Sequence, residues 1–139
     1  MDRFTRRYLI TLAVLGGVGG GVWYLSGDRE ARRLNRVLAR DPRLSEYPYR
    51  FRVLSVDHGV ATLTTPRNVD VPGPRFLAVA FPELADLPPE HPRMQAAMTE
   101  LKALQEYAAA VVEADPEISR VHWSLDEAWL SRRGIVVPP

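Results

Sequence analysis

Three histidines are the residues of this chain best suited to acid–base or metal chemistry. His58, His91 and His122 are separated by more than thirty residues at each step, and none has a second histidine at H-x-x-x-H spacing. Zinc sites usually draw on such closely spaced ligands. The chain contains no cysteine, which excludes a disulfide framework, a thiol nucleophile and cysteine metal ligands. This pattern predicts no metal site.

The remaining candidates for catalysis are equally scattered. Asp57 beside His58 fits a turn, in which an aspartate caps the backbone. The acidic residues Glu83, Asp86 and Glu90 have no neighbouring group for acid–base work. Three serines lack the glycines of a nucleophile elbow: Ser45, Ser119 and Ser124. We therefore expect no catalytic residue, no cofactor and no enzymatic activity.

The element that must position everything else is an uncharged stretch near the amino terminus. Tyr8–Leu25 is eighteen residues long and contains no charge. As a helix it would span roughly 27 Å, close to the hydrocarbon core of a bilayer. Trp23 and Tyr24 at its end match the aromatic preference for the interface. Residues 1–27 are therefore interpreted as an N-terminal signal anchor, a single transmembrane helix.

Two other interpretations compete for residues 1–27. A cleaved signal peptide needs small residues before the cleavage site, where this chain has bulky Trp23, Tyr24 and Leu25. A glycine-rich phosphate loop must follow a strand and open a helix, whereas these glycines lie inside an apolar run. The uncleaved anchor is favoured over both.

Thr5–Ile10 (TRRYLI) resembles the twin-arginine export signal through Arg6 and Arg7. This resemblance implies a cytoplasmic amino terminus and an exported domain. Arginines on the far side of the anchor partly balance this orientation signal. We expect a single-pass protein of the bacterial inner membrane, with its soluble domain in the periplasm.

Small residues form two rows along the predicted anchor. Such rows let a second transmembrane helix approach closely and gain van der Waals contact. Alternatively, the glycines lower hydrophobicity for export. The packing interpretation assigns helix contact to Ala13, Gly16, Gly17, Gly20 and Gly21.

The charge distribution restricts the partners. Residues 28–50 carry seven arginines against four acidic residues, a net of +3, whereas residues 51–139 carry eight basic against twelve acidic residues, a net of −4. An acidic main domain argues against nucleic acid. A helix is expected over 29–40, capped by Asp28. Its arginines are either a solvated face or contacts to anionic lipid headgroups. The candidate headgroup contacts are Arg29, Arg32, Arg33 and Arg36.

A hairpin follows the first helix. Arg50–Val56 alternates, Asp57–Gly59 supplies a turn, and Val60–Thr65 is a β-branched return strand. Residues 66–92 contain seven prolines, which exclude a continuous helix or a central strand. The apolar island Arg75–Phe81 inside this insertion is interpreted as an edge strand or a contact site. Its candidate partner contacts are Phe76, Leu77, Val79 and Phe81.

The last third predicts a helix and a strand. Residues 93–114 have apolar side chains at helical spacing, and Asp115-Pro116 ends the helix. Ile118–Leu125 alternates, with Trp123 on its apolar face. The tail, residues 131–139, either adds a short strand or docks on a neighbour. The fold class is α+β, with one domain over residues 28–130 behind the anchor.

The order of these elements resembles a BON domain, a small αββαβ module of bacterial envelopes. The similar segments are Leu34–Leu44, Val53–Leu63 and Ala108–Leu125. Two glycine positions typical of the family differ, because Thr64-Thr65 and Glu117-Ile118 occupy them, and the insertion is additional. The resemblance implies binding or scaffolding at membranes without catalysis.

Two functions follow as hypotheses. The first is a non-catalytic, membrane-anchored accessory or scaffolding subunit of an inner-membrane complex, including an energy-transducing (respiratory or photosynthetic) one, whose partners are other transmembrane subunits and the bilayer. The alternative is a stand-alone periplasmic lipid- or envelope-binding BON-like module. A periplasmic enzyme of unknown type stays as a third class.

Overall fold

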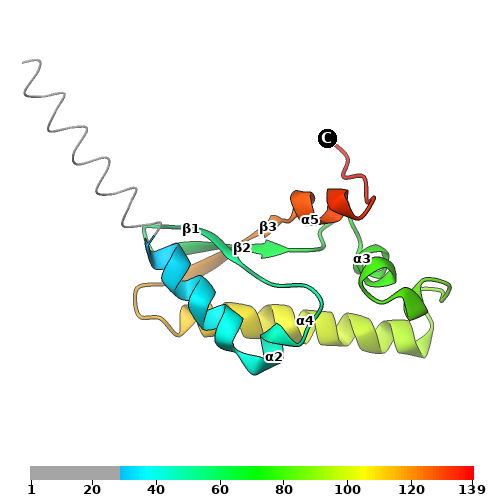
Figure 1. The fold of residues 1–139 in the computed structure, drawn as a ribbon, viewed down its shortest axis with the longest axis horizontal. Helices are drawn as coiled ribbons and strands as arrows, with labels where there is room; N and C mark the ends of the chain where they lie inside the picture. Colours follow the sequence, from blue (N-terminus) through cyan, green and yellow to red (C-terminus); the bar gives the residue numbers. More distant parts are fainter. Residues whose placement is uncertain (1–28) are drawn as a thin grey trace, which may run out of the picture.

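The computed structural model describes residues 29–139 (Figure 1). The predicted anchor lies outside these residues, together with Asp28, the export arginines Arg6 and Arg7, and the small residues assigned to helix packing: Ala13, Gly16, Gly17, Gly20 and Gly21. Within residues 29–139, no helix is both long and apolar enough to span a bilayer.

The described residues form a small α+β domain, which confirms the predicted fold class. Residues 29–40 are helical. The elements that follow are α2 (Pro42–Ser45), β1 (Val53–Asp57), β2 (Val60–Thr65), α3 (Gly73–Ala80), the 3-10 helix η1 (Pro82–Leu84), α4 (Pro92–Glu113), β3 (Arg120–Leu125) and α5 (Glu127–Arg132).

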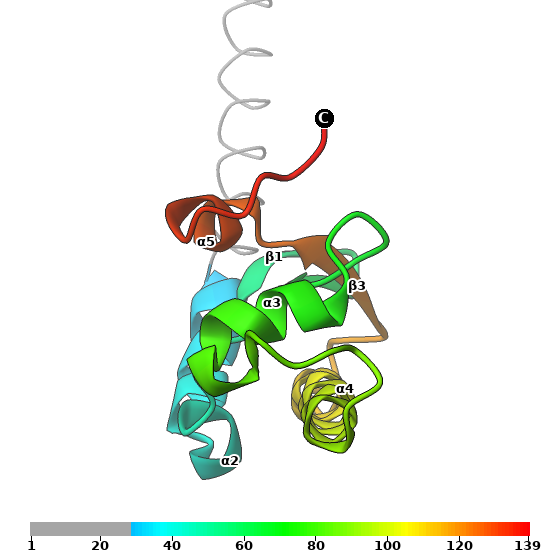
Figure 2. The ribbon, with the colours of Figure 1, turned by 90° about the vertical axis from the view of Figure 1, so that its right-hand side faces the viewer.

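The three strands form one sheet in the order β1-β2-β3. β1 and β2 are the predicted hairpin, joined by His58 and Gly59 at φ +48° and +79°. Positive φ at both positions is the type I′ geometry that matches the twist of paired strands. β3 joins β2 in parallel, after a crossover that includes α3 and α4. The helix over 29–40 and α4 cover one side of the sheet (Figures 1 and 2).

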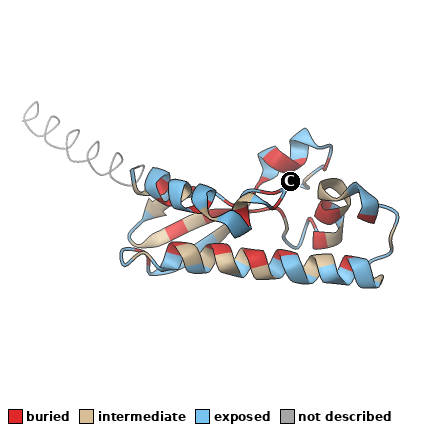
Figure 3. Cartoon of the chain, turned by 60° about the horizontal axis from the view of Figure 1, so that its bottom comes forward, coloured by how far each residue is buried: buried red, intermediate tan, exposed pale blue. Residues whose placement is uncertain are grey.

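The core lies between this sheet and its helices. The first helix buries Ala31, Leu34 and Leu38, whereas Val37 is 46% exposed. Buried and exposed positions alternate along α4 (Figure 3). The buried set of α4 is Met94, Leu101, Leu104, Ala108 and Val112. The helical spacing in the sequence therefore located the core face of α4.

The proline-rich insertion is where the structure corrects the sequence interpretation. Arg75–Phe81 is not an edge strand, because its residues up to Ala80 belong to helix α3, and Phe81 lies between this helix and η1. Pro74 and Pro82 occupy the first turns of these helices, where a proline needs no hydrogen-bonded N–H. A side-chain carbon at Gly73 would collide with the thioether of Met98, so this glycine permits close packing of α3 on α4.

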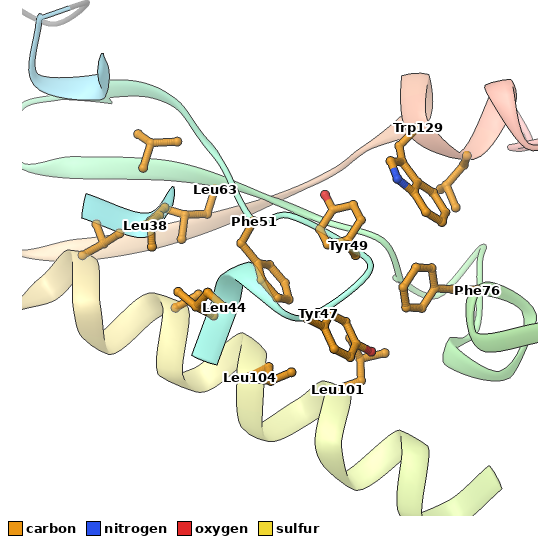
Figure 4. Packing of buried hydrophobic residues seen from close by; sticks show 14 of the residues in the cluster. Leu38, Leu44, Tyr47, Tyr49, Phe51, Leu63, Phe76, Leu101, Leu104 and Trp129 are labelled. Atoms are coloured by element: carbon orange, nitrogen blue, oxygen red, sulfur yellow. The ribbon is translucent and has the colours of Figure 1, made fainter. Parts of the chain in front are cut away.

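Aromatic residues gather where α3 meets the rest of the domain. The ring of Tyr49 lies 5.8 Å from that of Phe76 and 5.5 Å from that of Trp129, both edge to face. Phe51 is 5.1 Å from Tyr49 and leads from this cluster to Leu38, Leu44 and Leu63 (Figure 4). Aromatic pairs at such distances add to the free energy of burial. The insertion thus completes the core.

The carboxyl-terminal tail also differs from its prediction. Helix α5 extends to Arg132, so the expected boundary after residue 130 falls inside a helix. Ile135 beyond it is buried. Ser131 and Arg132 of the tail complete α5, and Ile135 packs on the domain's own core, while none of residues 131–139 is in a strand.

Asn35 fixes the start of β1 to the first helix. Its amide accepts a 2.7 Å hydrogen bond from Val53 N–H and donates one of 2.9 Å to Val53 C=O. We predict that Asn35→Ala lowers the free energy of unfolding by about 1–3 kcal/mol, because both backbone groups of a buried residue lose their partner. Thermal and urea unfolding of the full-length chain in detergent measures this. Exposed Arg36→Ala is the matched control, and an equal loss there would contradict the assignment.

Arg33 joins the first helix to the end of α4 by pairing with Asp115. The hydrogen bond from Arg33 lowers the pKa of the Asp115 carboxyl. A carboxyl group whose pKa is lower in the folded state than in the unfolded state stabilises the fold at pH values above its unfolded pKa. This contribution is lost as the pH falls through the folded pKa. At the same end, a hydrogen bond with Glu117 raises the pKa of Glu30. The stability that Glu30 contributes is therefore lost as the pH rises, opposite to the behaviour of Asp115.

We therefore predict that Asp115→Asn lowers the melting temperature at neutral pH, and that its difference from the parent chain shrinks as pH falls below about 4. Melting curves between pH 3 and 7 test this. A difference that stays constant with pH would contradict the role of the ion pair, and Glu113→Gln on the exposed side of α4 controls for general charge effects.

Candidate functional site

A groove lies between the first helix and the segment that leads into β1. Its volume is about 270 Å³. Leu38, Leu44 and Phe51 contribute largely buried side chains to it. The other lining residues are Asn35, Ala39, Ser45, Arg50 and Arg52. The groove is thus mainly apolar, with two arginines among its lining residues.

The sequence builds this groove through a turn around Asp41. The Asp41 carboxylate caps α2 by accepting hydrogen bonds from the backbone N–H of Arg43 and Leu44. It also accepts a 2.6 Å hydrogen bond from the Tyr107 hydroxyl of α4, which lowers the pKa of Asp41. These contacts set the direction in which the chain leaves the first helix, so that Leu44 turns inward.

The two arginines of the groove differ in their surroundings. Arg52 lies 3.6 Å from the Asp126 carboxylate, and its side chain is 55% exposed. Arg50 is exposed and has no ion-pair partner among residues 29–139. An apolar floor beside an uncompensated cation fits a ligand with an apolar part and an anionic group.

A buried carboxylate, Asp126, lies behind the groove. It accepts a 2.9 Å hydrogen bond from the Tyr49 hydroxyl and caps α5 through the N–H of Trp129 at 3.1 Å. Burial raises the pKa of the Tyr49 hydroxyl, and the negative charge of Asp126 acts in the same direction. Tyr49 therefore remains a hydrogen-bond donor, and both oxygens of the Asp126 carboxylate accept hydrogen bonds that link segments of the fold.

A second hollow of about 320 Å³ lies between the insertion and α4. Its lining residues are Phe81, Glu83, Leu84, Arg93, Ala96, Ala97 and Glu100. The buried Tyr47, whose ring centroid lies 5.8 Å from that of Phe81, has a hydroxyl without a hydrogen-bond partner in the described part of the chain. Burial raises the pKa of this hydroxyl.

The residues expected to contact a partner divide into two groups. Phe76 and Leu77 are completely buried in the core, so they leave no surface for a partner, which corrects that interpretation. Val79 and Phe81 are half-buried and pack against the same core. The apolar island is a core element of this domain.

The candidate headgroup arginines lie on the first helix, but they are not equivalent. Arg33 pairs with Asp115 and lies 4.0 Å from Glu117, so its charge is shared with acidic residues of its own chain. Arg29, Arg32 and Arg36 are exposed. The structure therefore places three of the four on the surface, where they can reach solvent or a headgroup.

The histidines are in three separate places. His58 lies in the hairpin turn and contacts Asp57, and His91 caps α4 by accepting a hydrogen bond from Arg93 N–H at 3.1 Å. His122 is exposed on β3. Among residues 29–139 no group of three or more metal-ligating side chains comes together. Glu83, Asp86 and Glu90 are exposed around η1 and the loop that follows it.

Comparison of the chain with protein-family models, with curated proteins and with solved structures found no match.

The sequence interpretation missed two features, the groove and the buried carboxylate of Asp126 with its hydrogen bond to Tyr49. Asp126 directly before a helical segment is a capping signal, but its partner Tyr49 lies 77 residues away. The groove combines a helix face with an irregular segment, for which no periodic pattern exists.

We predict that Asp126→Ala lowers the free energy of unfolding by about 2 kcal/mol, because it removes a helix cap and leaves the buried Tyr49 hydroxyl unpaired. Tyr49→Phe should cost about 1 kcal/mol, and the double variant less than the sum, since both remove the same hydrogen bond. Urea unfolding followed by tryptophan fluorescence measures the three values. Strict additivity, or a larger effect from exposed Arg52→Ala, would contradict this account.

Proposed function

We propose that this chain is a non-catalytic accessory subunit, anchored in a bacterial inner membrane, that binds other transmembrane subunits of a protein complex. The anchor prediction ends at residue 27, and the domain is already helical at residue 29. A domain attached so directly to a membrane helix works within a short distance of the bilayer. A periplasmic location for the domain is part of the same proposal.

The observation that carries this proposal is where the ionisable groups with shifted pKa values lie and what they bind. In active sites, groups with shifted pKa values converge on a cleft. In the described domain they are spread out, and most of them pair with a residue of a distant segment, whereas the pKa of Tyr47 is raised mainly by burial, without a hydrogen-bond partner within residues 29–139. The pairs are Asp41 with Tyr107, Asp115 with Arg33, and Tyr49 with Asp126. Their role is to hold segments together, which supports a scaffold.

A relation to BON domains is the finer part of the fold proposal. The order helix, hairpin, helix, strand follows the αββαβ order that the resemblance implies. α3 and η1 occupy the insertion. Similar elements in the same order support a binding or scaffolding role, although a fold alone does not establish a function.

A second candidate function rests on the groove beside the first helix. Its apolar floor and the unpaired Arg50 suit an amphiphile with an anionic headgroup, and this favours a stand-alone module that binds lipid or envelope components. The acidic main domain, at a net of −4 over residues 51–139, repels an anionic surface and counts against it.

Gentle detergent extraction followed by native electrophoresis and mass spectrometry tests the leading proposal. We expect the chain to comigrate with other membrane proteins in fixed stoichiometry. Gly17→Leu combined with Gly20→Leu should abolish comigration, since bulky side chains block close helix packing. Val22→Leu, on the face of the predicted helix opposite the glycine rows, is the matched control.

The alternatives give different results in the same experiment. A lone species that binds anionic vesicles, and loses this binding in Arg50→Glu, would favour the lipid-binding module. Comigration that survives the glycine substitutions would overturn the role of the anchor in assembly.

A further inference from the structure

The outer edge of β3 carries backbone groups without partners. Arg120 N–H donates to Gly59 C=O at 3.3 Å, and Asp126 N–H donates to Thr65 C=O at 2.9 Å. Alternate residues of a parallel strand direct their N–H and C=O to the same neighbour. The N–H and C=O of Val121, Trp123 and Leu125 therefore face away from β2. Within residues 29–139 no hydrogen bond to these groups is formed.

The opposite edge of the sheet is protected. β1 has an irregularity between Val53 and Ser55, and the Asn35 side chain occupies the outward N–H and C=O of Val53. Bulges and side-chain plugs are devices that prevent unwanted strand pairing. β3 has no bulge, because its pairing register with β2 is unbroken from Arg120 to Leu125. The strand also contains no proline or lysine, and no side chain of residues 29–139 bonds to its outward backbone groups. The β1 edge is thus irregular and plugged at its start, whereas the β3 edge is regular and unplugged within residues 29–139.

We propose that β3 pairs antiparallel with β3 of a second copy of this chain, which joins the two sheets into one of six strands. Residues that lie directly opposite each other share a face of the sheet. Val121, Trp123 and Leu125 adjoin the core, with Trp123 packed 6.1 Å from Phe51, whereas His122 and Ser124 lie on the other face.

Only registers that preserve these faces are compatible with a continuous core. With Trp123 on the two-fold axis, Val121 lies opposite the partner subunit's Leu125, and His122 lies opposite the partner subunit's Ser124. The apolar ladder of one copy then continues into that of the other. A two-fold interface requires this self-complementarity of one surface.

Charge complementarity also selects an antiparallel second copy. Exposed Arg120 begins β3 and exposed Glu127 follows it, and neither has an ion-pair partner among the described residues. The antiparallel arrangement places Arg120 near the partner subunit's Glu127, whereas a parallel one brings like charges together. The two-fold axis is normal to the sheet, so residue 29 of both copies lies at one level. Insertion of both chains into one bilayer rests on the proposed function, whereas the pairing itself does not.

The absence of cysteine permits a direct test of pairing and register. His122 and the partner subunit's Ser124 form a non-hydrogen-bonded pair, whose Cα atoms lie about 4.5 Å apart. This separation is within disulfide reach. Identical positions, His122 with the partner subunit's His122, are diagonal neighbours about 7–8 Å apart, beyond that reach. Full-length His122→Cys and Ser124→Cys chains carry different tags and are oxidised in detergent, separately and mixed.

We expect the mixed sample to give at least fivefold more disulfide-linked dimer than either variant alone. Leu54→Cys, on the protected edge and 54% exposed, is the matched control and should not cross-link. Arg120→Glu should reduce the yield severalfold, and Arg120→Glu with Glu127→Arg should restore it. Circular dichroism confirms that each variant is folded.

Equal yields in mixed and separate samples, predominant self-linkage of His122→Cys, or linkage only to a different polypeptide would each overturn the proposal. Comigration with other membrane proteins is measured separately. Comigration without β3 cross-linking would overturn the pairing of β3 and leave the accessory-subunit proposal standing. Cross-linking of β3 without comigration would overturn the accessory-subunit proposal and leave the pairing standing.

Discussion

The buried carboxylate of Asp126 is the contact on which most of the arrangement depends. Its side chain is nearly inaccessible, so it must be fully hydrogen-bonded to remain inside the domain. The Tyr49 hydroxyl and the first turn of α5 supply these bonds, while Asp126 N–H pairs with Thr65 at the end of β2. One residue thereby joins the chain entering β1, the end of β2 and the start of α5.

The aromatic cluster is a consequence of this junction. The capped helix α5 places the Trp129 ring 5.3 Å from Phe76 of α3, and Tyr49 lies against both. A chain without residues 66–92 would expose one side of Tyr49 and Trp129. The proline-rich segment is therefore integral to this core, and any relation to a shorter αββαβ module must include a rebuilt interior at this end of the sheet.

The sequence predicted those elements that carry a periodic signal. α4 extends over six turns with a regular apolar stripe, and the hairpin has alternating strands around a glycine turn, so both were located to within a few residues. Arg75–Phe81 is too short for its apolar run to distinguish helix from strand, and prolines that exclude a long helix favour the start of a short one. The partners Tyr49 and Asp126, or Asn35 and Val53, are set by the tertiary fold, and no local pattern encodes them.

The two edge strands of the sheet, β1 and β3, differ in how their outward backbone groups are covered. A strand edge exposes backbone groups that either pair or remain hydrated. At β1, the first helix supplies Asn35, and this plug also fixes the helix to the sheet. At β3, α4 packs beneath the strand and supplies no side chain to the edge backbone, within residues 29–139. A polar side chain of the kind used at β1 would cover the backbone groups of one residue, whereas three residues of β3 face outward, and residues 29–139 supply no such side chain to any of them. We therefore assign the proposed pairing with a second copy to β3, whose open edge lies beside an apolar face that includes Trp123.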